Sequence, residues 1–317
     1  MNLLRLPLLV LTDVFKNMDF KEKFFISLLS KRARNTLKIT SVPSEISFHC
    51  RNFLQIRLEN STSDEIFRVE TEGSYNIGGE EIRLSFLSNT ICLQQKTIQK
   101  RLLLANCVLD IFNKPTISKS FQNPTVPSSA IKFMKMINQR KLCIKSFDYS
   151  ITTPSSEFIK QILNECTEVT DSVSMDAEFP DDFVYIPPRP FKTTKLYVIF
   201  TISTNWLNLE YFMNCRRITL HIGANSNRTP KSWNTFLRNW IDSDSPLEDF
   251  AFYYIERSNF LLIVNGLSNE GIQQRGDDEW IDVKRKNGSE FVIGRNGGCI
   301  YIWTKQAHLE HLRRQEQ

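Results

Sequence analysis

Apolar residues crowd the first part of the chain in a spacing that predicts helices. Pro7 suits the first position of a helix, because its missing N–H would have no partner there. A helix of this kind, apolar nearly all round, is buried on more than one side. In so short a segment, we expect one of those sides to contact another protein. Leu8, Leu11, Phe15 and Met18 fall on one face of this helix, and Leu9, Val10 and Val14 cover most of the rest.

The segment that follows, from about residue 41, changes to a strand pattern. Residues 53–58 and 66–70 alternate apolar and polar positions around a polar turn at 59–65, which predicts a β-hairpin with one wet face. Residues 82–84 and 91–93 indicate a second strand pair. Helical spacing of apolar residues then predicts a helix over residues 97–112.

From residue 125 onward, strands and helices recur at intervals of a few tens of residues. Pro127, Pro154 and Pro230 each precede a helical pattern, and Leu207 to Phe212 gives a weaker one. This recurrence is typical of an irregular, leucine-rich-repeat-like α/β array, in which each unit buries its apolar face against its neighbours. The alternating strands that we expect between the helices are centred on Ile144, Met175, Val198, Leu220 and Phe252.

The end of the chain carries a hairpin signal. Asn287-Gly288 lies between alternating runs and favours a tight two-residue turn, and residues 299–303 would add a third strand. We expect this hairpin to cap the array, whose last unit would otherwise expose its core. The residues from His308 to Gln317 are polar and predict a solvated tail. The whole pattern predicts a mixed α+β (α/β) fold.

Several of these features together resemble a known family. Leu6-Pro7, the apolar helix, Asp19 before a Phe-rich helix and Ser30-Lys31-Arg32 before a third resemble the F-box of the nematode-type F-box family. The stretch from about residue 195 to 255, with Asn205-Trp206 and Ser232-Trp233, resembles the type-2 F-box-associated region of the same family. The resemblance implies three segments: an F-box at 1–40, a hairpin and helix connection at 41–124, and a repeat-like substrate-binding domain at 125–317.

The resemblance also implies a function and partners. It implies the substrate receptor of a Skp–cullin–F-box ubiquitin ligase, which binds an acidic Skp adaptor and through it a cullin. Residues 1–40 carry a net charge of +5, equal to that of the whole chain, and this charge would steer an acidic partner. The expected adaptor contact comprises Leu6, Pro7, Val10, Val14 and Met18, with Lys31 and Arg32 nearer the rim.

Two other roles are open for the N-terminal helices. The N-terminal helices could instead be purely structural, in a protein-interaction scaffold that belongs to no ligase. Nucleic acid is the rival acidic partner, but the basic residues alternate with apolar surface and no base-reading motif accompanies them. The sequence therefore favours a protein partner for this segment.

The sequence offers no enzymatic chemistry. His308 and His311 fall in the polar tail, while Asp181-Asp182 and Asp277-Asp278-Glu279 fall in expected solvated turns, and no phosphate-loop or nucleophile motif occurs. We therefore expect a non-enzymatic protein without cofactor or metal. The seven scattered cysteines, several within apolar runs such as Leu142-Cys143-Ile144, indicate core residues in a reducing compartment, the cytosol or nucleus. The apolar run at the N-terminus is too short to span a bilayer, so we expect no membrane partner.

A binding surface remains as the expected functional feature of the C-terminal part. If Val173, Met175, Ala177, Ile218, Leu220 and Ile222 face the core, strand alternation turns Ser174, Asp176, Thr219 and His221 to the other side. Tyr197 and Tyr253 would lie near them. The residues that we expect to bind a target protein are Asp176, Tyr197, His221 and Tyr253.

Overall fold

A computed structural model gives the architecture of the chain. It describes residues 6–40, 45–59, 71–87, 89–151, 156–177, 179, 182–199, 206–221, 228–253 and 255–315. The chain divides into two compact units, residues 1–151 and 152–317, and each is described by itself. In the described residues, no helix is both long and apolar enough to cross a membrane.

The first unit begins with three helices, α1 (Leu8–Asn17), α2 (Phe20–Leu29) and α3 (Lys31–Thr40), as the sequence pattern predicts. Pro7 precedes α1 as its N-cap residue and does not occupy the first helical position. A capping box starts α2, because the Asp19 carboxylate accepts the Glu22 N–H at 2.7 Å and the Glu22 carboxylate accepts the Asp19 N–H at 2.9 Å. The Ser30 hydroxyl accepts the Ala33 N–H at the start of α3.

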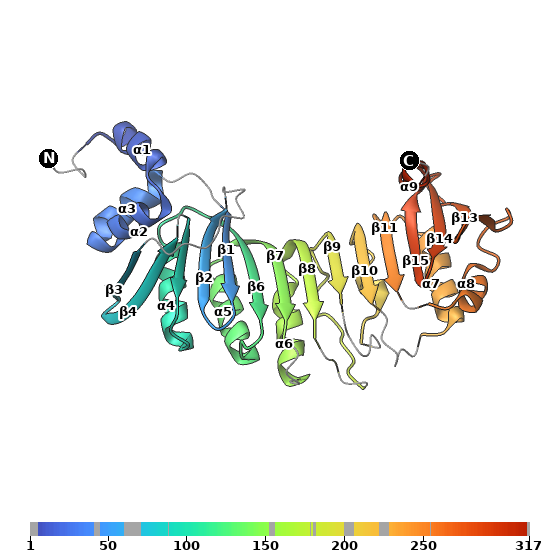
Figure 1. Ribbon diagram of the computed structural model, residues 1–317, viewed down its shortest axis with the longest axis horizontal. Coiled ribbons are helices and arrows are strands. Elements are labelled where there is room, and N and C mark those ends of the chain that lie inside the picture. Colours follow the sequence, from blue (N-terminus) through green and yellow to red (C-terminus); the bar gives the residue numbers. More distant parts are fainter. Residues whose placement is uncertain are drawn as a thin grey trace. The chain divides into compact units, whose positions relative to one another are not determined.

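The strands of the first unit form a sheet in the order β7-β6-β1-β2-β5-β4-β3. The side from β1 to β3 is antiparallel, whereas β1, β6 and β7 are parallel. Helices α4 (Ile98–Leu109) and α5 (Pro127–Gln139) accompany this sheet (Figure 1). The strands are β1 (Glu45–Cys50), β2 (Leu54–Glu59), β3 (Thr71–Ile77), β4 (Glu80–Leu87), β5 (Thr90–Leu93), β6 (Thr116–Gln122) and β7 (Cys143–Ser150).

The expected elements of this unit are found in part. The strand pair at 82–84 and 91–93 is confirmed as β4 and β5, and the helix expected at 97–112 is α4. The second strand of the hairpin expected at 53–70 lies outside the described residues, and β2 pairs with β1 and β5. The pattern did not indicate β1, β3 or β6.

Aromatic side chains join the first helices to the sheet of the same unit. The Phe25 ring of α2 lies 5.0 Å from the Phe86 ring of β4 and 5.2 Å from Tyr75 of β3, measured between centroids. Phe24 also contacts Phe86, at 5.9 Å, and Phe20 contacts Phe112, at 6.1 Å. Helix α2 is therefore packed on β3 and β4 through four rings, and Phe20 adds a separate contact with the segment after α4. We call Phe20, Phe24, Phe25, Tyr75, Phe86 and Phe112 the phenyl cluster.

The second unit contains a sheet in the order β8-β9-β10-β11-β15-β14-β13-β12. The strands from β8 to β11 are parallel and the others antiparallel. The elements are α6 (Ser156–Cys166), β8 (Val169–Asp176), β9 (Lys195–Val198), η2 (Leu209–Phe212), β10 (Arg217–His221), α7 (Pro230–Asp242), β11 (Asp249–Tyr253), α8 (Arg257–Val264), β12 (Gln273–Arg275), β13 (Asp278–Lys284), β14 (Glu290–Asn296), β15 (Cys299–Thr304) and α9 (Lys305–Arg314).

The repeat-like alternation and the C-terminal hairpin are confirmed in this unit. Asn287-Gly288 lies in the turn that joins β13 to β14, and β15 is the expected third strand. The turn has three residues, 286–288, and not the expected two, because the Arg285 N–H donates to the Ser289 carbonyl. The weak helical pattern near Leu207 gives a single 3₁₀ turn, η2, whose N-cap is Asn208. The structure adds α8, β12 and α9, which the pattern did not predict. Pro154 and the Asn205 position lie outside the described residues.

Helix α7 supplies four buried apolar side chains to the core of the second unit, two of them tryptophans. Pro230 occupies its first turn and the Thr229 hydroxyl caps the Ser232 N–H at 3.2 Å. Trp233 stacks on Phe252 of β11 with ring centroids 4.2 Å apart, and Trp240 donates its indole N–H to the Leu247 carbonyl at 3.1 Å. Both Trp side chains are buried, so the helix is fixed to one face of the sheet.

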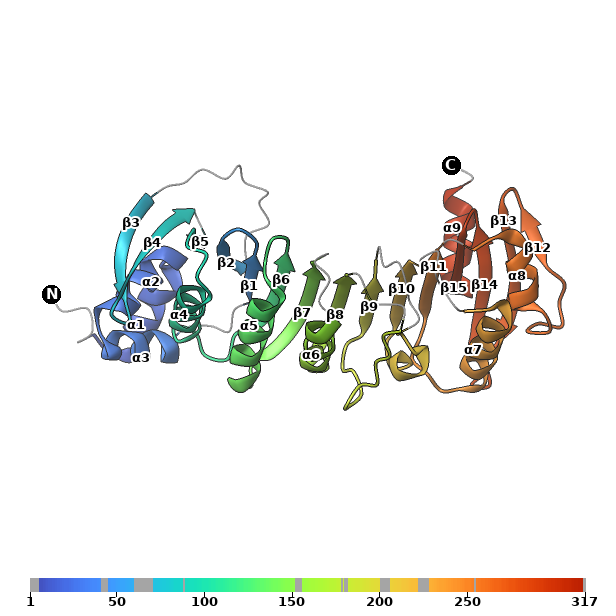
Figure 2. The same cartoon turned by 90° about the horizontal axis from the view of Figure 1, so that it is seen from below.

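The predicted strand alternation is confirmed over β8 and β10. Val173, Met175, Ala177, Ile218 and Leu220 are buried, while Ser174, Asp176, Thr219 and His221 are partly exposed on the other side of the strands. Ile222 lies outside the described residues. Helices α6 and α7 follow one face of the second unit's sheet (Figure 2). The opposite face of strands β8 to β11 is called the open face below.

Candidate adaptor-binding and target-binding surfaces

Helix α1 divides its apolar residues between the interior and the surface. Leu11 and Phe15 are buried against the rest of the unit. Leu9 is 81% exposed, Leu8 54% and Val10 44%, although all three are large apolar residues. A contiguous apolar patch of this kind marks an interaction site more often than a scattered exposed residue does. The all-round apolar helix is therefore half core and half exposed surface.

The structure places the expected adaptor-binding residues at different depths. Pro7 and Val10 are exposed in the patch, whereas Leu6, Val14 and Met18 are partly buried beside it. Lys31 and Arg32 are exposed at the start of α3. Leu8 and Leu9 were not among the expected contact residues, and neither were two further exposed apolar residues. These are Leu29 at the end of α2, 77% exposed, and Ile39 in α3, 69% exposed.

Basic side chains of α2 lie at the junction with the sheet. The Lys21 ammonium donates to the Thr71 hydroxyl at 2.5 Å and lies 5.9 Å from the centre of the Phe86 ring. Burial lowers the pKa of Lys23, which the nearby Asp19 and Glu22 carboxylates partly offset. Part of the positive charge counted in the first forty residues thus helps to fix α2 on the sheet and is not free to meet a partner.

The open face of the second unit brings some of the expected target-binding residues together. His221 and Tyr253 are register partners on β10 and β11, and their ring centroids lie 4.6 Å apart. Tyr197 lies one row away, because it is level with Thr219 of β10 and Ser174 of β8. Asp176 is level with His221 but two strands away, about 10 Å at the usual strand spacing. Three of the four residues thus form one neighbourhood and Asp176 lies at its edge.

A charged row that the sequence analysis missed borders this neighbourhood. The Arg217 guanidinium lies 2.7 Å from the Asp249 carboxylate, and the Lys195 ammonium lies 3.1 Å from Asp171. The Asp249 carboxylate is the largest cause of the raised pKa of Arg217, and the Tyr197 hydroxyl adds to it. The signal in the sequence is that residues 195, 217 and 249 begin three successive strands, which parallel register brings level.

Burial changes the titration of the aromatic pair on the open face. It lowers the pKa of His221 below the usual 6.5 and raises the pKa of Tyr253, to which Cys299 also contributes. Both shifts favour the neutral forms, so the centre of the open face is an uncharged aromatic patch beside a row of ion pairs. Tyrosine and histidine in such a setting suit protein recognition, because they combine apolar area with hydrogen-bonding groups.

Two acidic residues expected in a solvated turn are buried. Asp278 and Glu279 open β13 and are 2% and 3% exposed. Glu279 pairs with Arg257 and, at 3.5 Å, with Arg295, which places the carboxylate in an ion-pair network. The expectation of a turn was wrong because the strand begins two residues earlier than the alternating pattern indicates. Asp181 lies outside the described residues, and Asp182 is exposed as expected.

His308 also departs from the expectation. It was expected in a solvated tail, yet it is 2% exposed, because residues 305–314 form helix α9 and pack on β14 and β15. Cys143, expected in the core, is exposed, whereas Cys50, Cys166 and Cys215 are buried. The cysteines in the described part are free thiols, and no group of three His, Cys, Asp or Glu there is arranged to hold a metal ion.

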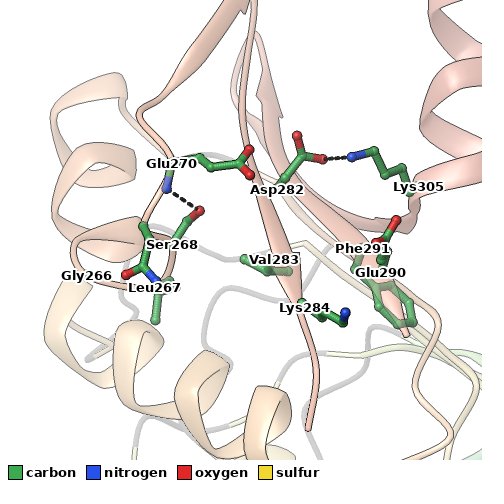
Figure 3. A pocket seen from close by; sticks show the side chains of 11 residues that line it. Gly266, Leu267, Ser268, Glu270, Asp282, Val283, Lys284, Glu290, Phe291 and Lys305 are labelled. Atoms are coloured by element: carbon green, nitrogen blue, oxygen red, sulfur yellow. Dashed lines mark hydrogen bonds and ion pairs between the residues drawn. The ribbon is translucent and has the colours of Figure 1, made fainter. Parts of the chain in front are cut away.

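A cavity in the second unit differs in character from a small-molecule site. It has a volume of about 330 Å³ and lies between residues 266–270 and the strands β13 and β14 (Figure 3). Glu270 and Lys284 line it, and Asp282 points toward Lys305, whose ammonium is 3.3 Å from the Asp282 carboxylate. Small-molecule pockets are mostly apolar with few polar groups. The walls of this cavity are largely polar and charged, and one pair of its charges, Asp282 and Lys305, is an ion pair, so it does not resemble a small-molecule site.

Comparison with known proteins gives the N-terminal helices a family. Residues 3–43 match the model of the F-box domain. Over 330 aligned residues, the chain is 24% identical to the Skn-1 dependent zygotic transcript 15 protein of Caenorhabditis elegans, covering 92% of this chain and 93% of that protein. No solved structure matches the chain. Helices α1 to α3 are therefore an F-box domain, and such domains in general support binding to the adaptor of a ubiquitin ligase.

Proposed function

We propose that this chain is the substrate-recognition subunit of a Skp–cullin–F-box ubiquitin ligase. The observation that carries the proposal is the exposed apolar patch of α1 within an F-box domain. Leu8, Leu9 and Val10 add to the adaptor contact first expected at Leu6, Pro7, Val10, Val14 and Met18. Lys31 and Arg32 lie at its rim. The adaptor in turn brings a cullin.

The target protein binds the open face of the second unit in this proposal. The aromatic neighbourhood of Tyr197, His221 and Tyr253 is its centre, and Asp176 is at its edge. Residues 125–317 act as the substrate-binding domain and resemble a type-2 F-box-associated region. F-box proteins in general act as adaptors and not as enzymes, so the chain works by proximity. It raises the effective concentration of a target near a charged conjugating enzyme.

The decisive experiment is co-purification of the full chain with a Skp adaptor. Val10→Asp places a charge in the exposed patch without entering the core, so we expect loss of adaptor binding with unchanged unfolding. Truncation of an interface anchor usually costs about 2 kcal/mol or more, roughly a thirtyfold change in affinity. Val184→Asp is the matched control, because Val184 is 72% exposed but lies outside the F-box domain.

The outcomes of this experiment separate the two remaining functions. Loss of binding in Val10→Asp together with wild-type binding in Val184→Asp supports the ligase. A wild-type chain that does not bind a Skp adaptor would contradict the proposal and favour a scaffold whose N-terminal helices are structural.

A further inference from the structure

Helix α9 lies on the same face of the second unit's sheet as the open face of strands β8 to β11. The strand registers show this, because Ala251 of the open face is level with Tyr301 of β15, and Tyr301 is level with Gly294 of β14. Gly294 is in turn level with Trp280 of β13. Trp280 and Tyr301 both contact α9, which Figure 2 shows across the sheet from α7.

The surface beneath α9 is aromatic and continues the open face. Tyr301 stacks on Trp303 with centroids 4.1 Å apart, and Trp280, Val292 and Tyr301 form a buried cluster against which Trp303 and Leu312 pack. Without α9, these rings would be exposed beside Ala251 and Tyr253. The helix therefore covers an aromatic extension of the open face.

The residue at the centre of this contact is His308. Its ring lies 4.9 Å from the Trp280 ring and 6.1 Å from the Tyr301 ring, and it is 2% exposed. Neither ring nitrogen has a hydrogen-bond partner among the residues that the structure describes. A buried imidazole without a partner can remain neutral at modest cost, but a buried unpaired imidazolium is strongly disfavoured.

We propose that α9 is a pH-sensitive cover, docked on the aromatic surface while His308 is neutral and released when His308 takes up a proton. Thr304, which caps α9 by accepting the Ala307 N–H at 3.2 Å, connects the helix directly to β15 and provides the pivot. The release itself is independent of the proposed function. Its consequence, a larger target-binding face in acid, rests on that function.

The groups around His308 determine whether protonation of its ring is favoured or opposed in the docked state. On α9, His311 and Lys305 oppose a further positive charge, whereas Asp278 and Asp282 of β13 favour it. From β14 the residues on this face are Glu290, Val292, Gly294 and Asn296, of which only Glu290 titrates, and it is exposed at the start of the strand. Strand β15 contributes the neutral Tyr301 hydroxyl. Desolvation is the largest influence and lowers the pKa of His308 below 6.5.

Docking of α9 therefore gains its full stability only above the ordinary histidine pKa. As the pH falls below about 6.5, the released His308 becomes protonated and the docked form loses stability until the lower pKa of the docked state is reached. Asp278 also holds the C-terminal end of α9. It accepts from Gln315 at 3.1 Å and lies 3.6 Å from His311, so the two histidines need separate tests.

The experiment is hydrogen–deuterium exchange of the α9 amides in the full chain at about pH 7.5 and about pH 5.5, corrected for intrinsic rates. We expect protection of residues 305–314 to fall by up to about tenfold per unit of pH below the ordinary histidine pKa. His308→Phe keeps an aromatic ring and should remove this pH dependence, and His311→Gln should retain it. Iodide quenching of tryptophan fluorescence should rise in acid with the wild type and not with His308→Phe.

Two results would overturn the proposal. One is equal protection of α9 at both pH values in the wild type, and the other is a full acid response in His308→Phe. If His308→Phe leaves α9 unprotected at both pH values, His308→Leu replaces it in the same comparison. The adaptor pull-down does not involve α9, so failure here is distinguishable from failure of the proposed function.

Discussion

At the scale of single residues, Gly294 has a steric role that the sequence does not reveal. A Cβ at this position would overlap the ring of Tyr301, whose edge lies over the glycine. We expect Gly294→Ala to destabilise the second unit by about 1–3 kcal/mol, the usual cost of overpacking. Gly271→Ala is the control, because nothing lies within 4 Å of its Cβ and its φ is not positive. Urea unfolding measures both, and equal stability of the two variants would contradict this role.

Residue chemistry also explains which site features could be predicted from the sequence. Strand alternation correctly turned His221 away from the core, because Ile218 and Leu220 are strongly apolar. The burial of His308 could not be predicted from its neighbours in the sequence. Its helix is polar, and Trp280, whose ring packs against it, lies 28 residues upstream. The exposure of Leu9 could not be predicted for the opposite reason. In a helix that is apolar nearly all round, the pattern does not distinguish a residue that faces solvent from one that faces the core.

At the scale of elements, the start of α2 depends on a reciprocal cap. Asp19 and Glu22 satisfy each other's backbone N–H groups, and α2 carries three of the five phenylalanines of the phenyl cluster. We expect Asp19→Ala to lower the free energy of unfolding of the first unit by about 1 kcal/mol. Thermal unfolding followed by circular dichroism would show it. Asp13→Ala, in the exposed part of α1, should change stability by less than about 0.5 kcal/mol. An equal loss in the two variants would rule out the cap.

Elements with clear periodicity were predicted, and the missed ones break it. Strand β6 has a register shift between Ile117 and Ser118 and buries Lys119, so its apolar residues do not alternate. Strand β1 is an exception, because Ile46, Phe48 and Cys50 are buried and alternate along it, yet it was not predicted. By contrast, the two Trp residues of α7 repeat at seven positions and Asn287-Gly288 marks its turn directly. Local sequence signals thus predict many of the helices and strands, whereas other strands depend on pairing with distant parts of the chain.

At the scale of the whole molecule, adaptor binding and the fold of the second unit should respond to different substitutions. Trp240 is fully buried, contacts Phe291 at 5.0 Å and lies under the Arg285 guanidinium, also at 5.0 Å. We expect Trp240→Ala to cost about 3–5 kcal/mol and to loosen β10 and β11 together. Limited proteolysis would detect this loosening, and the same variant should still bind the adaptor. Val10→Asp should show the reverse pattern.

Loss of adaptor binding together with the C-terminal fold in Trp240→Ala would contradict a separate adaptor-binding segment. Trp240→Phe serves as the milder control, because it keeps an aromatic ring in contact with Phe291 but loses the indole donor to Leu247. Its stability should lie between those of the wild type and Trp240→Ala.

The phenyl cluster limits how this F-box domain can be exchanged between related chains. Because Phe20, Phe24 and Phe25 of the F-box domain pack on rings from β3, β4 and the segment after α4, a graft cut at residue 40 would expose aromatic surface on both pieces. A chimera that takes residues 1–151 as one cassette keeps every ring with its native neighbours. Exchange of F-boxes between relatives, in the laboratory or by gene rearrangement, should therefore preserve stability only when the joint lies after the last of these rings, Phe112.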